Sequence, residues 1–179
     1  MSRRLLWLIV TGTIAVAMSA GVYVAYRQRP PEPALVADVY DRLWATRLPD
    51  TSGKPQPLAQ WQGRILVINF WATWCPPCRE EMPILSRLQA KYAANGVQIV
   101  GIALDTAPNV TKFAAAHPPG YPLLTGDAST SELSRLLGNM QLALPYTVVF
   151  DRGGAARMTH LGRISEADLD AKLAELVGN

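Results

Sequence analysis

The most constraining feature of this chain is a Cys-x-x-Cys pair, Cys75 and Cys78, which are the only two cysteines among 179 residues. The pair lies between an apolar, β-branched run, Ile65–Phe70, and a segment with helical periodicity. A thiol at a helix N-terminus meets unpaired N–H groups and the helix dipole, which lower its pKa and favour a nucleophilic thiolate. A second thiol one turn along can attack the resulting mixed disulfide. The pattern therefore predicts a redox-active Cys75–Cys78 disulfide, with Cys75 as the nucleophile and Cys78 as the resolving thiol.

Two other roles for the pair are less favoured. A structural zinc site usually needs four ligands, and the two histidines, His117 and His160, lie far away in the sequence. We therefore predict no metal site and place both histidines in loops or at the surface. A purely structural disulfide between these cysteines would stabilise the fold little, because closing so short a loop removes little entropy from the unfolded chain.

The residues around the pair, Asn-Phe-Trp-Ala-Thr-Trp-Cys-Pro-Pro-Cys at 69–78, resemble the thioredoxin superfamily. More narrowly they resemble the membrane-anchored TlpA/ResA/DsbE(CcmG)-like thiol:disulfide oxidoreductases, over residues 45–177. The resemblance implies an α/β, thioredoxin-like fold with a central mixed β-sheet flanked by helices, an N-terminal hairpin and a central strand–helix insertion.

The periodicity of the sequence agrees with that fold, because strands alternate with helices. We expect strands at 65–71, 97–104, 121–124, 146–150 and 155–161, and helices at 76–94, 108–116, 129–138 and from 165 onward.

The resemblance also implies a substrate-binding surface made of Trp74, Pro76, Leu144 and Pro145. Pro145 precedes a predicted strand, as does the cis-proline of thioredoxin-like proteins, so Leu144–Pro145 is the candidate cis bond. Trp74 flanks the nucleophile, although simple packing would explain an aromatic residue there equally well. Ala143 stands where the resembled subfamily usually has glycine, so the substrate groove can differ in shape.

Glu81, three residues after Cys78, matches a buried acid of ResA-like proteins. A carboxyl group there could exchange a proton with Cys78 and shift the pKa values of the thiols. The alternative is an ordinary solvated helix charge, which we expect for the neighbouring Glu80. Asn69 stands where ordinary thioredoxins have a buried aspartate, so general-base chemistry would fall to Glu81 or to water.

The N-terminal region predicts a membrane anchor. Residues 1–4 form a short basic start, and residues 5–26 carry no charge over a length that can cross a bilayer. A cleaved signal peptide is the alternative. We expect a linker at 27–44 and a thioredoxin-like domain at 45–179. The short basic N-terminus favours a single-pass protein of the bacterial inner membrane, with the domain in the periplasm or on the equivalent outer side.

The charge of the chain does not indicate nucleic-acid binding. Four of the 17 basic residues but only one of the 14 acidic residues precede residue 34, so the remainder carries 13 of each. The basic isoelectric point therefore belongs to the N-terminal segment rather than to the domain.

We expect a membrane-tethered thiol-disulfide oxidoreductase that needs no cofactor. The resemblance favours reduction of protein disulfides, in apocytochrome c or a copper-site protein, with electrons from a DsbD- or CcdA-type transmembrane donor. A disulfide-forming oxidant is the close rival, and a Cu(I) metallochaperone using the same cysteines is a third possibility. A peroxidase is disfavoured, because the Pro-x-x-x-Thr-x-x-Cys pattern of peroxiredoxins is absent: Ala72 and Ile68 occupy the Thr and Pro positions.

Overall fold

The computed structural model describes residues 34–126 and 128–178. The predicted anchor at 5–26 and the first part of the predicted linker lie outside the described residues. Among the helices that are described, none has both the length and the apolar character needed to cross a membrane. The chain divides into two compact units, residues 1–38 and 39–179. The second unit begins within helix α2 (Ala34–Ala45) and contains the sheet and the cysteine pair.

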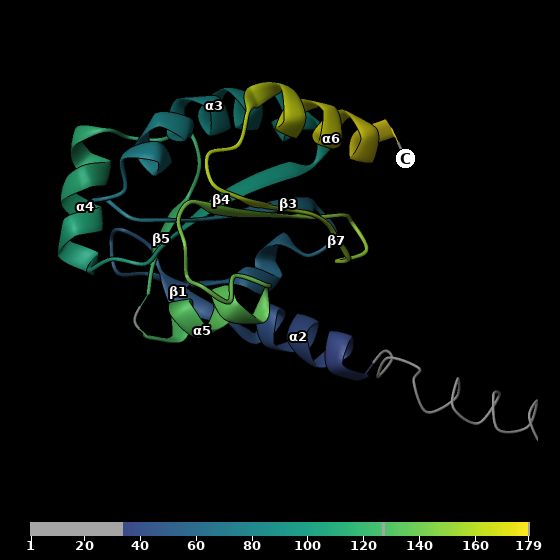
Figure 1. Ribbon diagram of the computed structural model, residues 1–179, viewed down its shortest axis with the longest axis horizontal. Helices are drawn as coiled ribbons and strands as arrows, with labels where there is room; N and C mark the ends of the chain where they lie inside the picture. Colours follow the sequence, from purple (N-terminus) through teal and green to yellow (C-terminus); the bar gives the residue numbers. More distant parts are fainter. Residues whose placement is uncertain (1–33, 127, 179) are drawn as a thin grey trace, which may run out of the picture. The chain divides into compact units, whose positions relative to one another are not determined.

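A five-stranded mixed sheet forms the centre of the second unit (Figure 1). Its strand order is β5-β4-β3-β6-β7. β3 pairs in parallel with β4 and antiparallel with β6, which confirms the predicted mixed sheet. The strands are β3 (Ile65–Trp71), β4 (Val97–Ala103), β5 (Leu123–Thr125), β6 (Tyr146–Phe150) and β7 (Ala156–Leu161).

Strand β5 begins two residues later than the sequence predicts. Pro122 has no N–H to give to the ladder, and its carbonyl oxygen instead accepts a hydrogen bond from Gly101 N at 2.9 Å. Regular pairing with β4 starts at Leu123.

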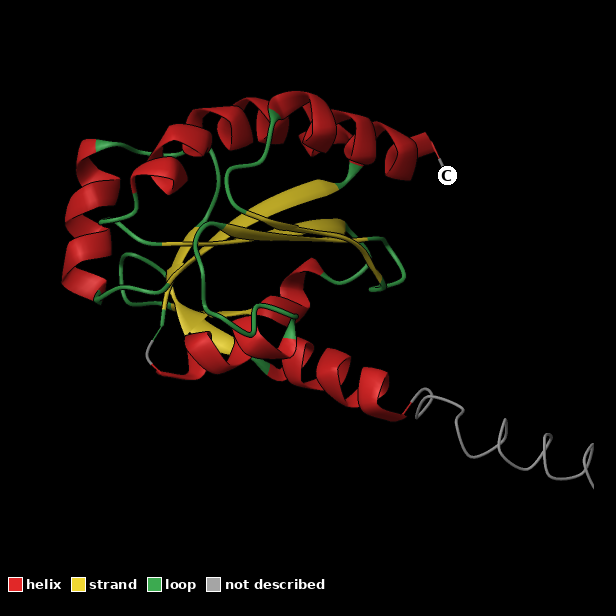
Figure 2. Cartoon of the chain, viewed as in Figure 1, coloured by secondary structure: helices red, strands yellow, loops and turns green. Residues whose placement is uncertain are grey.

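Helices cover both faces of the sheet (Figure 2). α3 (Pro76–Tyr92) and α6 (Glu166–Gly178) lie on one face, and α5 (Ala128–Leu136) lies on the other, where the part of α2 from Val39 onward also packs (Figure 1). α4 (Ala107–Ala116) lies at one end, between β4 and β5 in the chain. This is the predicted strand–helix insertion.

The predicted N-terminal hairpin is also present. β1 (Arg47–Pro49) pairs antiparallel with β2 (Pro55–Pro57), and a short 3₁₀ helix, η1 (Leu58–Trp61), leads toward β3. Leu43, within the segment that the sequence assigned to a linker, is fully buried.

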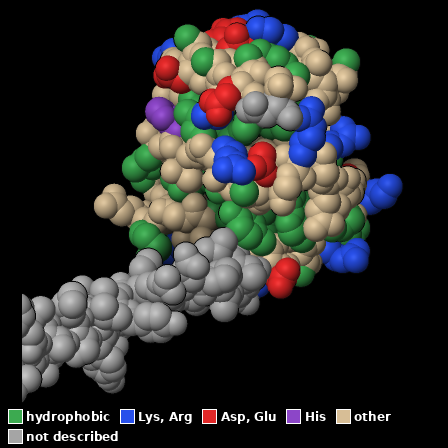
Figure 3. All heavy atoms as spheres, turned by 90° about the vertical axis from the view of Figure 1, so that its right-hand side faces the viewer, with side chains coloured by type: hydrophobic (Ala, Val, Ile, Leu, Met, Phe, Trp, Pro, Cys, Tyr) green, Lys and Arg blue, Asp and Glu red, His purple; other side chains and the backbone are tan. Residues whose placement is uncertain are grey.

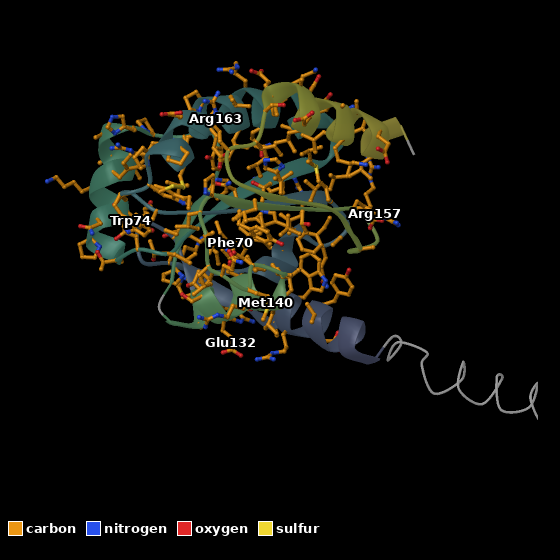
Figure 4. All side chains as sticks on the ribbon, in the orientation of Figure 1. Phe70, Trp74, Glu132, Met140, Arg157 and Arg163 are labelled. Carbon is orange, nitrogen blue, oxygen red and sulfur yellow. A yellow bond between two sulfur atoms is a disulfide. The ribbon has the colours of Figure 1, made fainter. Side chains whose placement is uncertain are left out.

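Strand β3 separates two apolar cores. Its side chains alternate between the two faces of the sheet, and all seven residues are buried. Ile65, Val67 and Trp71 pack into the core beneath α3 and α6. Leu66, Ile68 and Phe70 pack into the opposite core, and Figure 4 places Phe70 in the interior. A strand buried on both faces explains why its sequence shows no polar alternation.

Charged side chains of both signs are interspersed on the face drawn in Figure 3. Between α3 and α6, Arg87 pairs with Glu166 and Lys91 with Asp170. Exposed pairs of this kind contribute little to stability in water, because solvent screens them. The two apolar cores therefore hold the helices on the sheet.

We predict that Gly101→Ala destabilises the fold. A Cβ atom at Gly101 would lie 2.6 Å from Leu123 Cδ2 and 3.2 Å from Trp71 Nε1, and such overpacking typically lowers the free energy of unfolding by about 1–3 kcal/mol. Urea unfolding at equilibrium measures the change. Gly178→Ala is the control, since a Cβ there meets nothing within 4 Å. Equal stability of the two variants would contradict the prediction.

Candidate active site

The two cysteines form a disulfide at the start of α3. The S–S distance is 2.03 Å, and the Cα atoms lie 5.4 Å apart. Cys75 is the N-cap residue of α3, and its Sγ accepts a hydrogen bond from Cys78 N at 3.3 Å. In the dithiol state, the same N–H and the helix dipole would face the Cys75 sulfur, where they favour a thiolate. The structure therefore provides the environment that the sequence predicts for a nucleophilic Cys75.

The surroundings of the pair distinguish the two sulfurs. Pro76 and Pro77 occupy the first turn of α3, where no intrahelical N–H is required. Cys75 retains 3% exposure, and Cys78 is fully buried. The neighbouring Trp74 is 66% exposed, and Figure 4 shows it at the end of the molecule where α4 lies. The little exposure that remains at the pair therefore belongs to Cys75 rather than to Cys78.

The loop before β6 carries the expected cis-proline. The Leu144–Pro145 peptide bond is cis, and Pro145 O accepts a hydrogen bond from Gly162 N at 2.8 Å. Asn139 holds the loop from inside: its Oδ1 accepts from Ala143 N, and its Nδ2 donates to Ala143 O. Asn139 was not among the residues predicted from the sequence, although an Asn directly after the helix-ending Gly138 is a turn signal.

Glu81 is fully buried, one turn of α3 beyond Cys78. Its Oε1 accepts a hydrogen bond from Asn69 Nδ2 at 2.7 Å, and its Oε2 accepts one from Ile164 N at 3.0 Å. Asn69 Nδ2 also donates to Thr147 Oγ1 at 3.1 Å. The structure thus brings Glu81 and Asn69 into contact, whereas the sequence linked them only through their expected roles and did not predict the contact.

Burial raises the pKa of Glu81 above its ordinary value of 4.5. Hydrogen bonds from Ile164 N and Asn69, and the charges of His160 and Arg163, oppose this effect without cancelling it. Burial and the charge of Glu81 in turn raise the pKa of Tyr121. Glu81 therefore holds its proton to higher pH than an exposed glutamate does, which suits a group that exchanges protons with a thiol.

The remaining predicted residues lie at or near the surface. Glu80 is exposed, and Arg163 Nη1 donates to its Oε2 at 3.3 Å. His117 is exposed and stacks on the ring of Phe113, with 4.9 Å between centroids. His160 is half-buried, and its Nε2 lies 3.3 Å from Arg163 O. In the described part of the chain, no group of three or more His, Cys, Asp or Glu side chains could hold a metal ion.

Asp105, a second residue not predicted from the sequence, accepts hydrogen bonds on its carboxylate from Thr73 N at 3.1 Å and from Thr73 Oγ1. No local pattern signals this contact, because the partners lie 32 residues apart.

Comparisons with known proteins agree with this geometry. The Redoxin family model matches residues 23–173. The thiol-disulfide oxidoreductase ResA of Geobacillus thermodenitrificans is 28% identical over 130 residues, which cover 72% of each chain. A crystal structure of a putative thiol:disulfide interchange protein DsbE from Chlorobium tepidum superimposes with a TM-score of 0.67 at 29% identity, covering 74% of this chain and 93% of that one. A thioredoxin-related protein from Neisseria meningitidis serogroup B is 32% identical with a TM-score of 0.65, covering 74% and 99%.

We predict that Glu81→Gln changes how stability depends on pH. Because the pKa of Glu81 is raised in the folded state, the folded state binds more protons than the unfolded state between pH 4.5 and the folded pKa. The contribution of Glu81 to stability is therefore complete below pH 4.5 and is lost as pH rises through the folded pKa. Gln cannot ionise, so Glu81→Gln should gain stability relative to wild type over that interval.

Urea unfolding of both proteins across this pH range measures the difference. Glu80→Gln is the matched control, because Glu80 is the exposed neighbour on the same helix. A stability difference between Glu81→Gln and wild type that does not change with pH would contradict the prediction.

Proposed function

This chain belongs to the Redoxin family and is a thiol-disulfide oxidoreductase of the ResA/DsbE type, and we propose that it reduces protein disulfides while tethered to the outer side of the bacterial inner membrane. The observation that carries the proposal is the Cys75–Cys78 pair at the N-terminus of α3, with the buried Glu81 one turn away. The likeness to ResA and to a DsbE-like protein supports thiol-disulfide exchange, and the reducing direction is the one that the resemblance of the sequence implies.

The reaction takes place in two exchanges. The Cys75 thiolate attacks one sulfur of the substrate disulfide, which forms a mixed disulfide and releases one substrate thiolate. The Cys78 thiolate then attacks Cys75 Sγ, which releases the second substrate thiolate and leaves the Cys75–Cys78 disulfide. Two electrons pass from the enzyme to the substrate, and the disulfide in the structure is the product state of this cycle.

Glu81 supplies the proton step of the second exchange. Cys78 is fully buried, so its thiol needs an internal group to accept the proton as it becomes a nucleophile. Glu81 lies three residues along the helix on the same face, and Asn69 and Ile164 N stabilise its carboxylate form. The proton then passes from Cys78 to Glu81, and the departing substrate thiolates take up protons from solvent.

The substrate surface surrounds Cys75. Trp74 offers an exposed aromatic face, and the Leu144–Pro145 loop lies next to the end of β3, because Tyr146 pairs with Phe70. An extended polypeptide that contains a disulfide suits such a surface better than a compact small molecule.

The proposed location at the membrane would allow the dithiol to be regenerated after each reaction. The apolar segment 5–26 would anchor the chain, and a transmembrane dithiol donor of DsbD or CcdA type would return two electrons to Cys75–Cys78. The thiols of apocytochrome c or of a copper-site protein are the proposed substrates.

We predict that the Cys75–Cys78 pair of the full chain has a low reduction potential. Equilibration with dithiothreitol or glutathione buffers, followed by counting of free thiols, measures it. A value in the thioredoxin range, near roughly −270 mV, supports a reductant. A value near roughly −120 mV would reverse the assignment and make the protein a disulfide donor.

We also predict that Cys78→Ser traps mixed disulfides with substrate and Cys75→Ser does not. Without Cys78 the first exchange still occurs, but nothing resolves its product. Non-reducing gels after incubation of each reduced variant with a disulfide-containing peptide detect the adduct. Equal trapping by both variants would contradict the assigned roles, and tight Cu(I) binding by a wild type that reduces no disulfide would instead indicate a metallochaperone.

A further inference from the structure

Asp105, in the connection between β4 and α4, uses both carboxylate oxygens on different segments. Its Oδ2 accepts from Thr73 N at 3.1 Å and from Thr73 Oγ1. Its Oδ1 accepts from Thr106 N at 2.7 Å and from Asn109 Nδ2 at 3.0 Å. One carboxylate therefore joins the start of α4 to the residue two positions before Cys75.

The two carboxylate oxygens of Asp105 have separate roles. Thr106, the N-cap residue of α4, makes no side-chain capping bond of its own, so Oδ1 of Asp105 satisfies the beginning of that helix. Helix capping does not require Oδ2, which is used entirely on Thr73. The contact with Thr73 therefore needs an explanation apart from the stability of α4.

The chain on both sides of Asp105 packs against strand β3. Leu104 N donates to Trp71 O at 2.8 Å, which extends the pairing of β4 with β3. The ring of Phe113 on α4 lies 5.2 Å from the ring of Trp71, centroid to centroid. Both ends of the β4–α4 connection are thus fixed against the strand that leads to the cysteines.

The segment that Asp105 holds has few other restraints. Thr73 is half-buried and Trp74 is exposed, while Cys75 N donates to Ala72 O at 3.2 Å. Burial raises the pKa of Asp105, but hydrogen bonds from Thr73, Asn109 and Thr106 outweigh it and hold the pKa below its ordinary value. Asp105 is therefore a charged acceptor at neutral pH, and charged acceptors form the stronger hydrogen bonds.

We propose that Asp105 is a positioning residue for substrate docking: its contact with Thr73 fixes the Thr73–Trp74 segment, and so sets the Trp74 indole beside Cys75 for an incoming polypeptide disulfide. The proposal rests on the function proposed above. It assigns to the β4–α4 insertion a direct part in presenting the active site.

The test compares an extended substrate with a small one. The full-length protein, reduced, is reacted with a synthetic peptide that carries one intramolecular disulfide, and separately with 5,5′-dithiobis(2-nitrobenzoic acid). The small reagent needs the Cys75 thiolate but no docking surface. In this single turnover, Asp105→Ala should lower the second-order rate constant for the peptide by about tenfold, mainly by raising the peptide concentration that half-saturates the rate, since small misplacements of binding groups cost rate steeply. The rate with the small reagent should change by less than about twofold, because the helix N-terminus that activates Cys75 is unchanged.

Two variants at Thr73 separate docking from capping. Thr73→Val removes the hydroxyl donor and leaves Oδ1 of Asp105 on α4, so it should reproduce part of the loss with the peptide. Thr73→Ser keeps the hydroxyl donor, so its rate with the peptide should be close to that of wild type. The double variant Asp105→Ala/Thr73→Val should be no worse than Asp105→Ala alone, because both changes remove the same contact.

Asp50→Ala is the matched control. The Asp50 carboxylate likewise accepts several local bonds, from Ser52 N, Lys54 N and Gln56 Nε2, but it lies in the β1–β2 hairpin. The Asp50→Ala variant should therefore react with the peptide and with the small reagent at wild-type rates. Wild-type rates with the peptide in Asp105→Ala would overturn the proposal, and so would equal losses with both reagents. A wild type that fails to reduce the peptide would overturn the proposed function itself.

Discussion

Strand β3 is buried on both faces, and this constraint determines where the chemistry can be placed. Its neighbours are fixed by register: Phe70 lies opposite Tyr146, and Asn69 lies opposite Thr147. The residue before Tyr146 is Pro145, so the pairing of two apolar strands brings the cis-proline loop to the end of β3, where the chain turns into α3. The sheet thus brings the loop to the end of β3 that leads into the cysteines, although Pro145 lies 67 positions after Cys78 in the sequence.

The same strand carries one polar side chain into its apolar layer. Asn69, Thr147 and Glu81 are all fully buried, and burying such groups costs free energy unless hydrogen bonds compensate. Asn69 and Ile164 N occupy both oxygens of Glu81, whereas Asn69 Oδ1 has no partner among the described residues. An aspartate in place of Asn69 would set a second negative charge against Glu81, so the amide allows one buried acid to act alone.

The elements with strong periodicity could be predicted from the sequence. β3 and β6 have the expected bounds, because β-branched and aromatic runs between turns have few alternatives. The contacts that complete the site could not be predicted in this way. Glu81 meets a backbone N–H 83 residues away, and Asp105 meets Thr73 32 residues away; local patterns carry no information on such pairs. Leu43, in the segment predicted as a linker, shows the same limit, since no local pattern reveals that it joins the core.

The reducing power of the pair depends on opposing electrostatic effects. The N–H groups at the start of α3 stabilise a Cys75 thiolate, and stabilising the thiolate favours the dithiol state, which makes the disulfide a stronger oxidant. A deprotonated Glu81 acts in the opposite sense, because its negative charge disfavours a nearby thiolate. The charges of His160 and Arg163 partly offset the negative charge of Glu81, and burial raises the pKa of Glu81, so that it ionises only at higher pH. The same helix therefore activates the nucleophile at its N-cap and, six residues later, carries the group that limits how strongly the dithiol is favoured.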